Sequence, residues 1–179
     1  LSPGPALLEK AELYKQISNM WRITDDFWDD WRLLKAMFER AEKWCVHAAP
    51  GHWPDADMLV VGKVGWEKDL RDTRLTPDEQ YTHISLWALM ASPLLIGCDL
   101  TKMDDFTLGL LTNSEVLDIN QDSYGYQASR HISTDEEVVY VKPLDDNSIA
   151  VGVFNLTTEP RKIGFRPIDL GIIDEQIVR

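Results

Sequence analysis

Residues 19–31, NMWRITDDFWDDW, combine acidic and aromatic side chains at high density. Four carboxylates, one arginine, three tryptophans and one phenylalanine stand within this stretch. A solvated helix face explains the acids, but it does not normally carry so many large aromatic side chains. Carboxylates among aromatic rings are suited to general acid/base chemistry, in which a side chain gives or takes a proton in the transition state.

Arg22 and Asp26 are the two side chains in this stretch whose spacing favours such chemistry. We expect residues 19–26 to form a short strand, and because alternate side chains of a strand share a face, Arg22 and Asp26 should reach the same space. A carboxylate at the C-terminal end of a parallel strand, beside a guanidinium and walled by aromatic side chains, is well placed for proton transfer. The alternative is structural: these two form a buried ion pair, while Asp29 and Asp30 lie in the first turn of the next helix, where its dipole favours acids. Spacing alone leaves both interpretations open.

A second acidic pair, Asp55 and Asp57, lies in the segment GHWPDADML and also shares a face in an extended chain. With His52 nearby the pair could bind a metal ion, but the helical or loop spacing of specific metal motifs is missing. Structural hydrogen bonding at a strand end is the favoured interpretation. We therefore predict no metal site at these residues.

Composition limits the class of partner. The chain has 179 residues, 44% of them hydrophobic, a formal net charge of −12 and a pI near 4.6. This charge opposes contacts with nucleic-acid phosphates and with an anionic membrane, so we expect neither partner, and a neutral sugar or small molecule fits better.

The start LSPGPALLEK lacks signal-peptide features, so we expect a soluble protein and leave its localisation open. Cys45 and Cys98 predict two free, buried thiols.

Helix and strand patterns alternate around the acidic segments. Apolar periodicity and helix-start signals at Thr76 and Pro77 predict the helices, and β-type apolar runs predict the strands between them. The expected helices cover residues 7–18, 27–44, 77–90 and 105–117, and the expected strands cover residues 19–26, part of 49–62, and 93–100. Such alternation predicts a parallel α/β architecture.

The pattern changes near Gly125. The segments EEVVYVKPL (136–144) and SIAVGVFNL (148–156) alternate in twos, with a turn between them, and RKIGFRPIDL (161–170) could supply a third strand. We therefore divide the chain into an α/β region, residues 1–124, and an antiparallel β-domain of sandwich type, residues 125–179.

Four segments, taken in order, carry a resemblance to a known family. They are WRITDD, GHWPDADMLVVG, SLWALMASPLLIGCDL and LLTNSEVLDINQD, and they span residues 21–122. In this order they resemble the second half of the catalytic barrel of family 27 glycoside hydrolases, the α-galactosidases and α-N-acetylgalactosaminidases, in a bacterial form. The resemblance implies the C-terminal half of a (β/α)8 TIM barrel followed by an incomplete antiparallel β-domain.

The resemblance also implies a site. The family's general acid/base falls on Asp26, and the arginine that contacts the sugar and the catalytic carboxylates falls on Arg22. Ser2 stands near the segment that selects the group at sugar carbon 2, so the choice between a 2-hydroxyl and a 2-acetamido sugar stays open. The implied reaction is retaining hydrolysis of terminal α-linked galactose-type sugars by two carboxylates, and it needs no metal and no organic cofactor.

One part of the family's site has no match in this sequence. The family's nucleophile follows the fourth barrel strand, whereas this chain matches from about the end of the fifth. We therefore expect a segment, or one half of a two-chain enzyme, that is inactive and prone to self-association until the N-terminal half of the barrel is supplied. A sugar-binding relative without catalysis, or a half-barrel that serves only in assembly, are the alternatives.

Overall fold

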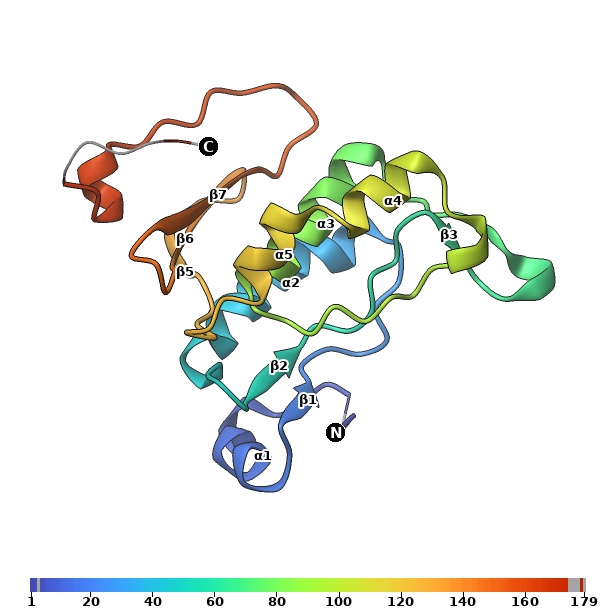
Figure 1. Ribbon diagram of the computed structural model, residues 1–179, viewed down its shortest axis with the longest axis horizontal. Helices are drawn as coiled ribbons and strands as arrows, with labels where there is room; N and C mark the ends of the chain where they lie inside the picture. Colours follow the sequence, from blue (N-terminus) through green and yellow to red (C-terminus); the bar gives the residue numbers. More distant parts are fainter. Residues whose placement is uncertain (3, 174–177, 179) are drawn as a thin grey trace.

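The protein is a mixed α/β structure built around parallel extended segments. A computed structural model describes residues 1–2, 4–173 and 178 (Figure 1). Strand β1 (Met20–Arg22) pairs in parallel with β2 (Trp53–Asp55). On the other side of β1, the backbone N–H of Arg22 donates to the carbonyl of Leu1, and beyond β2 a parallel bridge joins Leu59 to Ile96. Four extended segments thus lie in sequence order, as in part of a parallel barrel, but the described residues do not close one.

Helices connect these segments. They are α1 (Ala11–Ile17), α2 (Trp31–Trp44), α3 (Pro77–Leu89), α4 (Asp105–Leu111) and α5 (Ser114–Asn120). Asp30 caps α2 by accepting from the backbone N–H of Arg32 at 2.8 Å. Thr76 and Glu79 form a capping box at the start of α3, which explains why that helix begins where the sequence predicts. No helix within residues 1–2, 4–173 and 178 is long and apolar enough to cross a membrane.

An antiparallel sheet follows the last helix. Its strands are β5 (Ser129–Ser133), β6 (Glu137–Pro143) and β7 (Ile149–Asn155), in the order β5-β6-β7. Tyr140 of β6 donates its hydroxyl to the carbonyl of Phe38 in α2 at 2.7 Å, and both rings belong to one apolar cluster with residues of the α/β region. The sheet therefore packs on the helices, at the end of the helical layer opposite the β3 hairpin in Figure 1.

Several predicted elements are confirmed and others are wrong. The antiparallel pair β6 and β7 and helix α3 lie where expected, whereas residues 7–18 form a 3-10 turn (Leu8–Lys10) before α1 begins at Ala11. Residues 27–44 begin their helix only at Trp31. Residues 105–117 form two helices, because the side chain of Asn113 caps a second start by accepting from Val116 N–H. Residues 93–100 contribute a single bridge at Ile96 rather than a strand.

The third strand of the β sheet was also wrongly placed. Residues 161–170 end in a short 3-10 turn (Pro167–Leu170), and β5 provides the third strand instead. A small hairpin, β3 (Lys63–Val64) with β4 (Arg71–Asp72), was not predicted because its strands have two residues each. The division at residue 124 stays a prediction.

Candidate active site

Arg22 and Asp26 lie together, as the spacing predicts, but by a different geometry. Arg22 is the last residue of β1, and the chain then leaves the strand and turns. The turn returns the Asp26 carboxylate to the guanidinium, with 2.7 Å between Asp26 Oδ1 and Arg22 Nη2. The pair therefore depends on a turn after the strand, and the expected strand to residue 26 is wrong.

Asp57 brings a second carboxylate to the same arginine. Its Oδ2 lies 3.4 Å from Nη1 of Arg22 and accepts the backbone N–H of Phe27 at 2.7 Å. Its Oδ1 accepts the backbone N–H of Met58 at 2.9 Å. Asp57 has a φ of 75°, and Trp87 donates its indole N–H to the Asp57 carbonyl at 2.8 Å. These contacts fix the carboxylate in place, so Arg22 is oriented by acids on two segments.

Asp55 holds the backbone of Asp57 in place. Its Oδ1 accepts the backbone N–H of Asp57 at 2.8 Å, and its side chain is buried. Burial raises the pKa of the Asp55 carboxyl, a shift that the hydrogen bond from Asp57 opposes and the Asp57 charge reinforces. Structural hydrogen bonding by Asp55 and Asp57 is thus confirmed. The contact of Asp57 with Arg22 was missed, because the residues lie 35 positions apart in sequence.

The three charged side chains differ in exposure. Those of Arg22 and Asp57 are 19% and 13% exposed, whereas that of Asp26 is 76% exposed. The expected aromatic wall around Asp26 is therefore wrong in part: Trp21 and Phe27 are buried in the core. Asp26 thus presents a solvent-exposed carboxylate, paired on one side with the fixed Arg22 guanidinium, that can exchange a proton with a bound molecule.

Asp29 and Asp30 have separate structural roles. Asp30 caps α2, as described above. The sequence predicts Asp29 in the first turn of α2, but the residue lies before that helix. Its buried carboxylate accepts hydrogen bonds from the Arg71 guanidinium and, at 2.7 Å, from the backbone N–H of Arg74. Burial acts to raise the pKa of Asp29, but the Arg71 and Arg74 hydrogen bonds outweigh it and hold the pKa below its ordinary value.

Ser2 lies in the extended segment beside β1 and is exposed. In the same segment Gly4 has a φ of +25°, and a Cβ there would lie 3.1 Å from Nη2 of Arg22. Glycine thus lets this segment pass close to the charged cluster. The role of Ser2 at sugar carbon 2 stays a prediction.

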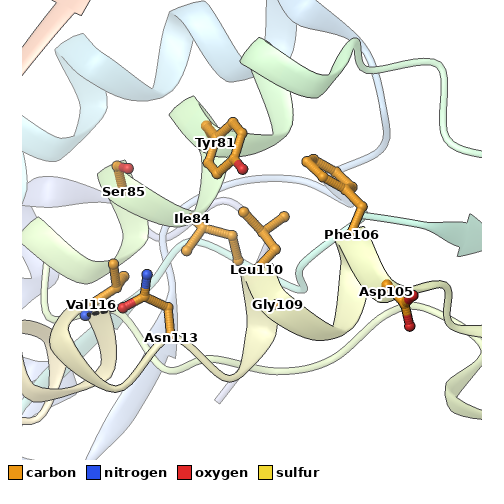
Figure 2. Close-up of a pocket in the computed structure, with 9 residues that line it drawn as sticks. All are labelled: Tyr81, Ile84, Ser85, Asp105, Phe106, Gly109, Leu110, Asn113 and Val116. Atoms are coloured by element: carbon orange, nitrogen blue, oxygen red, sulfur yellow. Dashed lines mark hydrogen bonds between the residues drawn. The ribbon is translucent and has the colours of Figure 1, made fainter.

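Two hollows lie on the surface of the described residues. The one in Figure 2, about 270 Å³, lies between α3, α4 and α5 and has none of the charged cluster in its lining. The other, about 430 Å³, includes Trp28 and Met58, which follow Asp26 and Asp57 closely in the chain. The lining of the second hollow also contains none of Arg22, Asp26 and Asp57.

Other titratable groups do not join the site. Cys45 and Cys98 are free, as predicted, but half-buried rather than fully buried. His83 is fully buried and accepts the backbone N–H of Val60 at 3.2 Å. Within the described ranges, no three or more His, Cys, Asp and Glu side chains are grouped so that they could hold a metal ion.

Comparison with known proteins identifies the family. The family model described as alpha galactosidase A matches residues 7–122. The chain belongs to glycoside hydrolase family 27. A solved family 27 β-L-arabinopyranosidase from Geobacillus stearothermophilus is 43% identical with a TM-score of 0.90, and the match covers 97% of this chain and 41% of that one. A further structure of that enzyme, as a variant, contains arabinose.

Other family 27 relatives carry different names. Alpha-galactosidase 2 of Arabidopsis thaliana is 36% identical over 162 residues, which cover 90% of this chain and 39% of the relative. The structure of a putative α-N-acetylgalactosaminidase from Bacillus halodurans is 41% identical with a TM-score of 0.74, covering 84% of this chain and 35% of that one. The chain thus spans about two fifths of the length of these family 27 relatives.

Proposed function

We propose that these residues form part of a retaining glycosidase that removes a terminal galactose-configured sugar. The observation that carries the proposal is the exposed Asp26 carboxylate held 2.7 Å from Arg22 just after a parallel strand. Active sites of barrel enzymes form at the C-terminal ends of the strands, from residues of several strands. Arg22 and Asp57 meet this description, and the family membership supports it.

In the proposed reaction Asp26 is the general acid/base. A carboxylate from the part of the barrel that these residues do not include attacks the anomeric carbon, while Asp26 gives its proton to the departing glycosidic oxygen. In the second step Asp26 takes a proton from a water molecule while the water oxygen attacks the anomeric carbon; the bond to the nucleophilic carboxylate breaks, and the sugar leaves with its anomeric configuration retained. The two carboxyl groups would stand about 5–5.5 Å apart. Arg22, fixed by Asp26 and Asp57, would orient the acid and contact the sugar.

Two sugars share the arrangement of ring hydroxyls that the proposal requires. β-L-Arabinopyranose has the ring configuration of α-D-galactopyranose but lacks the hydroxymethyl group. The α-galactosidase relatives favour an α-galactoside, and the Geobacillus β-L-arabinopyranosidase, matched over 97% of this chain, favours a β-L-arabinopyranoside. The α-N-acetylgalactosaminide is the remaining candidate, for which Ser2 would face the 2-acetamido group.

The test uses the whole protein and three methyl glycosides, the α-galactoside, the β-L-arabinopyranoside and the α-N-acetylgalactosaminide, because an alkoxide leaving group needs the proton that Asp26 would supply. We expect Asp26→Asn to lower kcat/KM for the accepted substrate by about 10³-fold, since general acid/base groups contribute about 10²- to 10⁴-fold. Asp25→Asn, an exposed neighbour, is the matched control and should stay within about threefold. Normal turnover by Asp26→Asn would refute the assignment, and no turnover by the wild type would refute the function.

A further inference from the structure

Helix α3 holds the extended segment that follows β2 through a line of buried polar side chains. Gln80, His83 and Trp87 stand at i, i+3 and i+7 of this helix, so they share one of its faces, and all three are buried. Gln80 Oε1 accepts the backbone N–H of Gly62 at 3.0 Å, and His83 Nε2 accepts that of Val60 at 3.2 Å. The helix therefore sets the position of this segment through its backbone groups.

Trp87 is the member of this line that contacts the charged cluster of Arg22, Asp26 and Asp57. Its indole N–H donates to the carbonyl of Asp57 at 2.8 Å, and Asp57 has a φ of 75°. A residue other than glycine keeps such a φ only where surrounding contacts hold it, because the conformation costs energy. Asp55 Oδ1 accepts the backbone N–H of Asp57 at 2.8 Å. The N–H and the carbonyl of Asp57 are thus both held, which fixes the direction in which its side chain leaves the backbone.

One carboxylate oxygen of Asp57 meets both groups that hold Asp26. Its Oδ2 accepts the backbone N–H of Phe27 at 2.7 Å, and this N–H belongs to the peptide bond that directly follows Asp26. The same oxygen lies 3.4 Å from Nη1 of Arg22, whose Nη2 lies 2.7 Å from Oδ1 of Asp26. Asp57 therefore holds the backbone next to Asp26 and, through Arg22, the Asp26 carboxylate.

A ring contact ties Trp87 to the same turn a second time. The ring of Phe27 is buried and packs against that of Trp87, with 5.0 Å between the ring centroids. The turn that carries Asp26 is thus held from α3 both by this packing and through Asp57. These contacts lie in the core of the described residues, so they do not depend on which surfaces the rest of the barrel covers.

We propose that Trp87 is a positioning residue for the acid/base steps: its indole N–H fixes the carbonyl of Asp57, so that the Asp57 carboxylate sets where Asp26 stands. The inference rests on the proposed glycosidase function, in which Asp26 gives a proton to the departing oxygen. Trp87 is fully buried and acts through Asp57. A displaced proton donor slows the departure of groups that need its proton and spares groups that leave without it.

The experiment compares two substrates of the whole protein that share one sugar, the methyl glycoside and the dinitrophenyl glycoside. Methoxide needs the proton from Asp26 to depart, whereas dinitrophenolate is stable enough to leave without it. Trp87→Phe keeps an aromatic ring and removes the N–H donor. We expect this variant to lower kcat/KM about tenfold for the methyl glycoside, since misplacement by about 1 Å can cost about 10²-fold, and to keep the dinitrophenyl glycoside within about threefold. The ratio of the two values therefore falls.

Trp21→Phe is the matched control. Trp21 is as fully buried as Trp87 and packs against the rings of Tyr14 and Trp44, but its indole N–H has no hydrogen-bond partner among the described residues. This variant removes the same atoms from the core without removing a bond to Asp57. A general loss of stability lowers both values of kcat/KM by the same factor, so their ratio should stay within about twofold of the wild type.

A second variant at position 87 keeps the test decisive if Trp87→Phe does not fold. Benzothienylalanine in place of Trp87 keeps the shape of the indole and has sulfur where tryptophan has the N–H, so it removes the donor alone. Its ratio should fall as in Trp87→Phe.

Asp57→Asn tests the second step of the inference. The amide has one oxygen, whereas the carboxylate of Asp57 accepts the N–H of Phe27 and that of Met58 with separate oxygens. The ratio should fall at least as far as in the position-87 variant. The double variant should match Asp57→Asn alone, because residues that act through one another are not additive.

The outcomes separate the inference from the proposed function. An unchanged ratio in the position-87 variant that folds, an equal fall in Trp21→Phe, or additive falls in the double variant would overturn the role of Trp87. If the wild type hydrolyses neither substrate, or if Asp26→Asn leaves the ratio unchanged, the proposed function has failed instead.

Discussion

Asp29 and Arg71 form a two-point ion pair between segments 42 positions apart. Nη1 of Arg71 lies 2.5 Å from Oδ2 of Asp29, and Nη2 lies 2.9 Å from Oδ1. The Asp29 side chain is 1% exposed and that of Arg71 is 38% exposed. This parallel geometry is the strongest form of a carboxylate–guanidinium contact. It joins the start of α2 to the β3–β4 hairpin.

Removal of Arg71 should destabilise the protein markedly. Arg71→Ala removes the guanidinium and leaves a buried carboxylate held by backbone N–H groups such as that of Arg74, and such a loss costs about 3 kcal/mol of unfolding free energy. Lys43→Ala is the matched control, since Lys43 and Glu39 form an exposed pair and its loss should cost less than about 1 kcal/mol. Denaturant unfolding of both variants measures the difference, and equal costs would contradict the assigned role of Asp29.

His83 should make the protein sensitive to acid. Burial lowers the pKa of His83 to about 3. The unfolded chain therefore binds this proton more tightly, and stability falls as the pH drops below about 6.5, by about 2 kcal/mol at pH 5. His83→Gln should show a smaller loss between pH 7 and pH 5, whatever its stability at pH 7. An unchanged loss in this variant would mean that other groups cause the acid sensitivity.

Lys142 should make the stability of the protein depend on pH in the alkaline range. Its side chain is fully buried and donates to the carbonyl of Ile119 and, at 3.5 Å, to that of Ala88, which joins β6 to α5 and α3. Burial lowers the pKa of Lys142 to about 8, although the charge of Asp122 opposes the shift. The unfolded chain thus binds the proton more tightly, and stability should rise between about pH 8 and pH 10.5, by roughly 1.4 kcal/mol per unit.

Lys142→Met removes this titration and should flatten the rise. The rise in stability is measured by thermal unfolding of wild type and variant at pH 8 and pH 10. Only the difference between the two proteins is used, because tyrosines and other lysines also titrate in this pH range. An identical rise in both proteins would show that Lys142 does not contribute.

Arg22→Lys should separate charge from geometry in the proposed active site. Lysine keeps the positive charge but lacks the planar fork that meets Asp26 and Asp57 together. We expect kcat/KM of the whole protein to fall about 10²-fold with little change in unfolding temperature. Lys63→Arg, an exposed lysine paired with Asp72, should leave both quantities unchanged. Full activity in Arg22→Lys would mean that a positive charge alone suffices at this position.

Local signals in the sequence determined most of the helices and two residues of the proposed site, Arg22 and Asp26. Thr76, Pro77 and Glu79 form a start signal within one turn, and α3 begins there because a capping box needs no distant partner. The strands β6 and β7 follow from alternation in twos. Arg22 and Asp26 are four positions apart, so a short turn can join them, and the family motif identifies both.

Tertiary structure decided the contacts between distant segments. Asp57 meets Arg22, Asp29 meets Arg71, and Trp66 meets Trp28, in each case across more than one element. Residues 93–100 have the apolar run of a strand, yet only Ile96 finds a bridge partner in Leu59. The physical reason is that caps and periodicity act within a few residues, whereas ion pairs, strand pairing and ring packing depend on which segments the fold brings together.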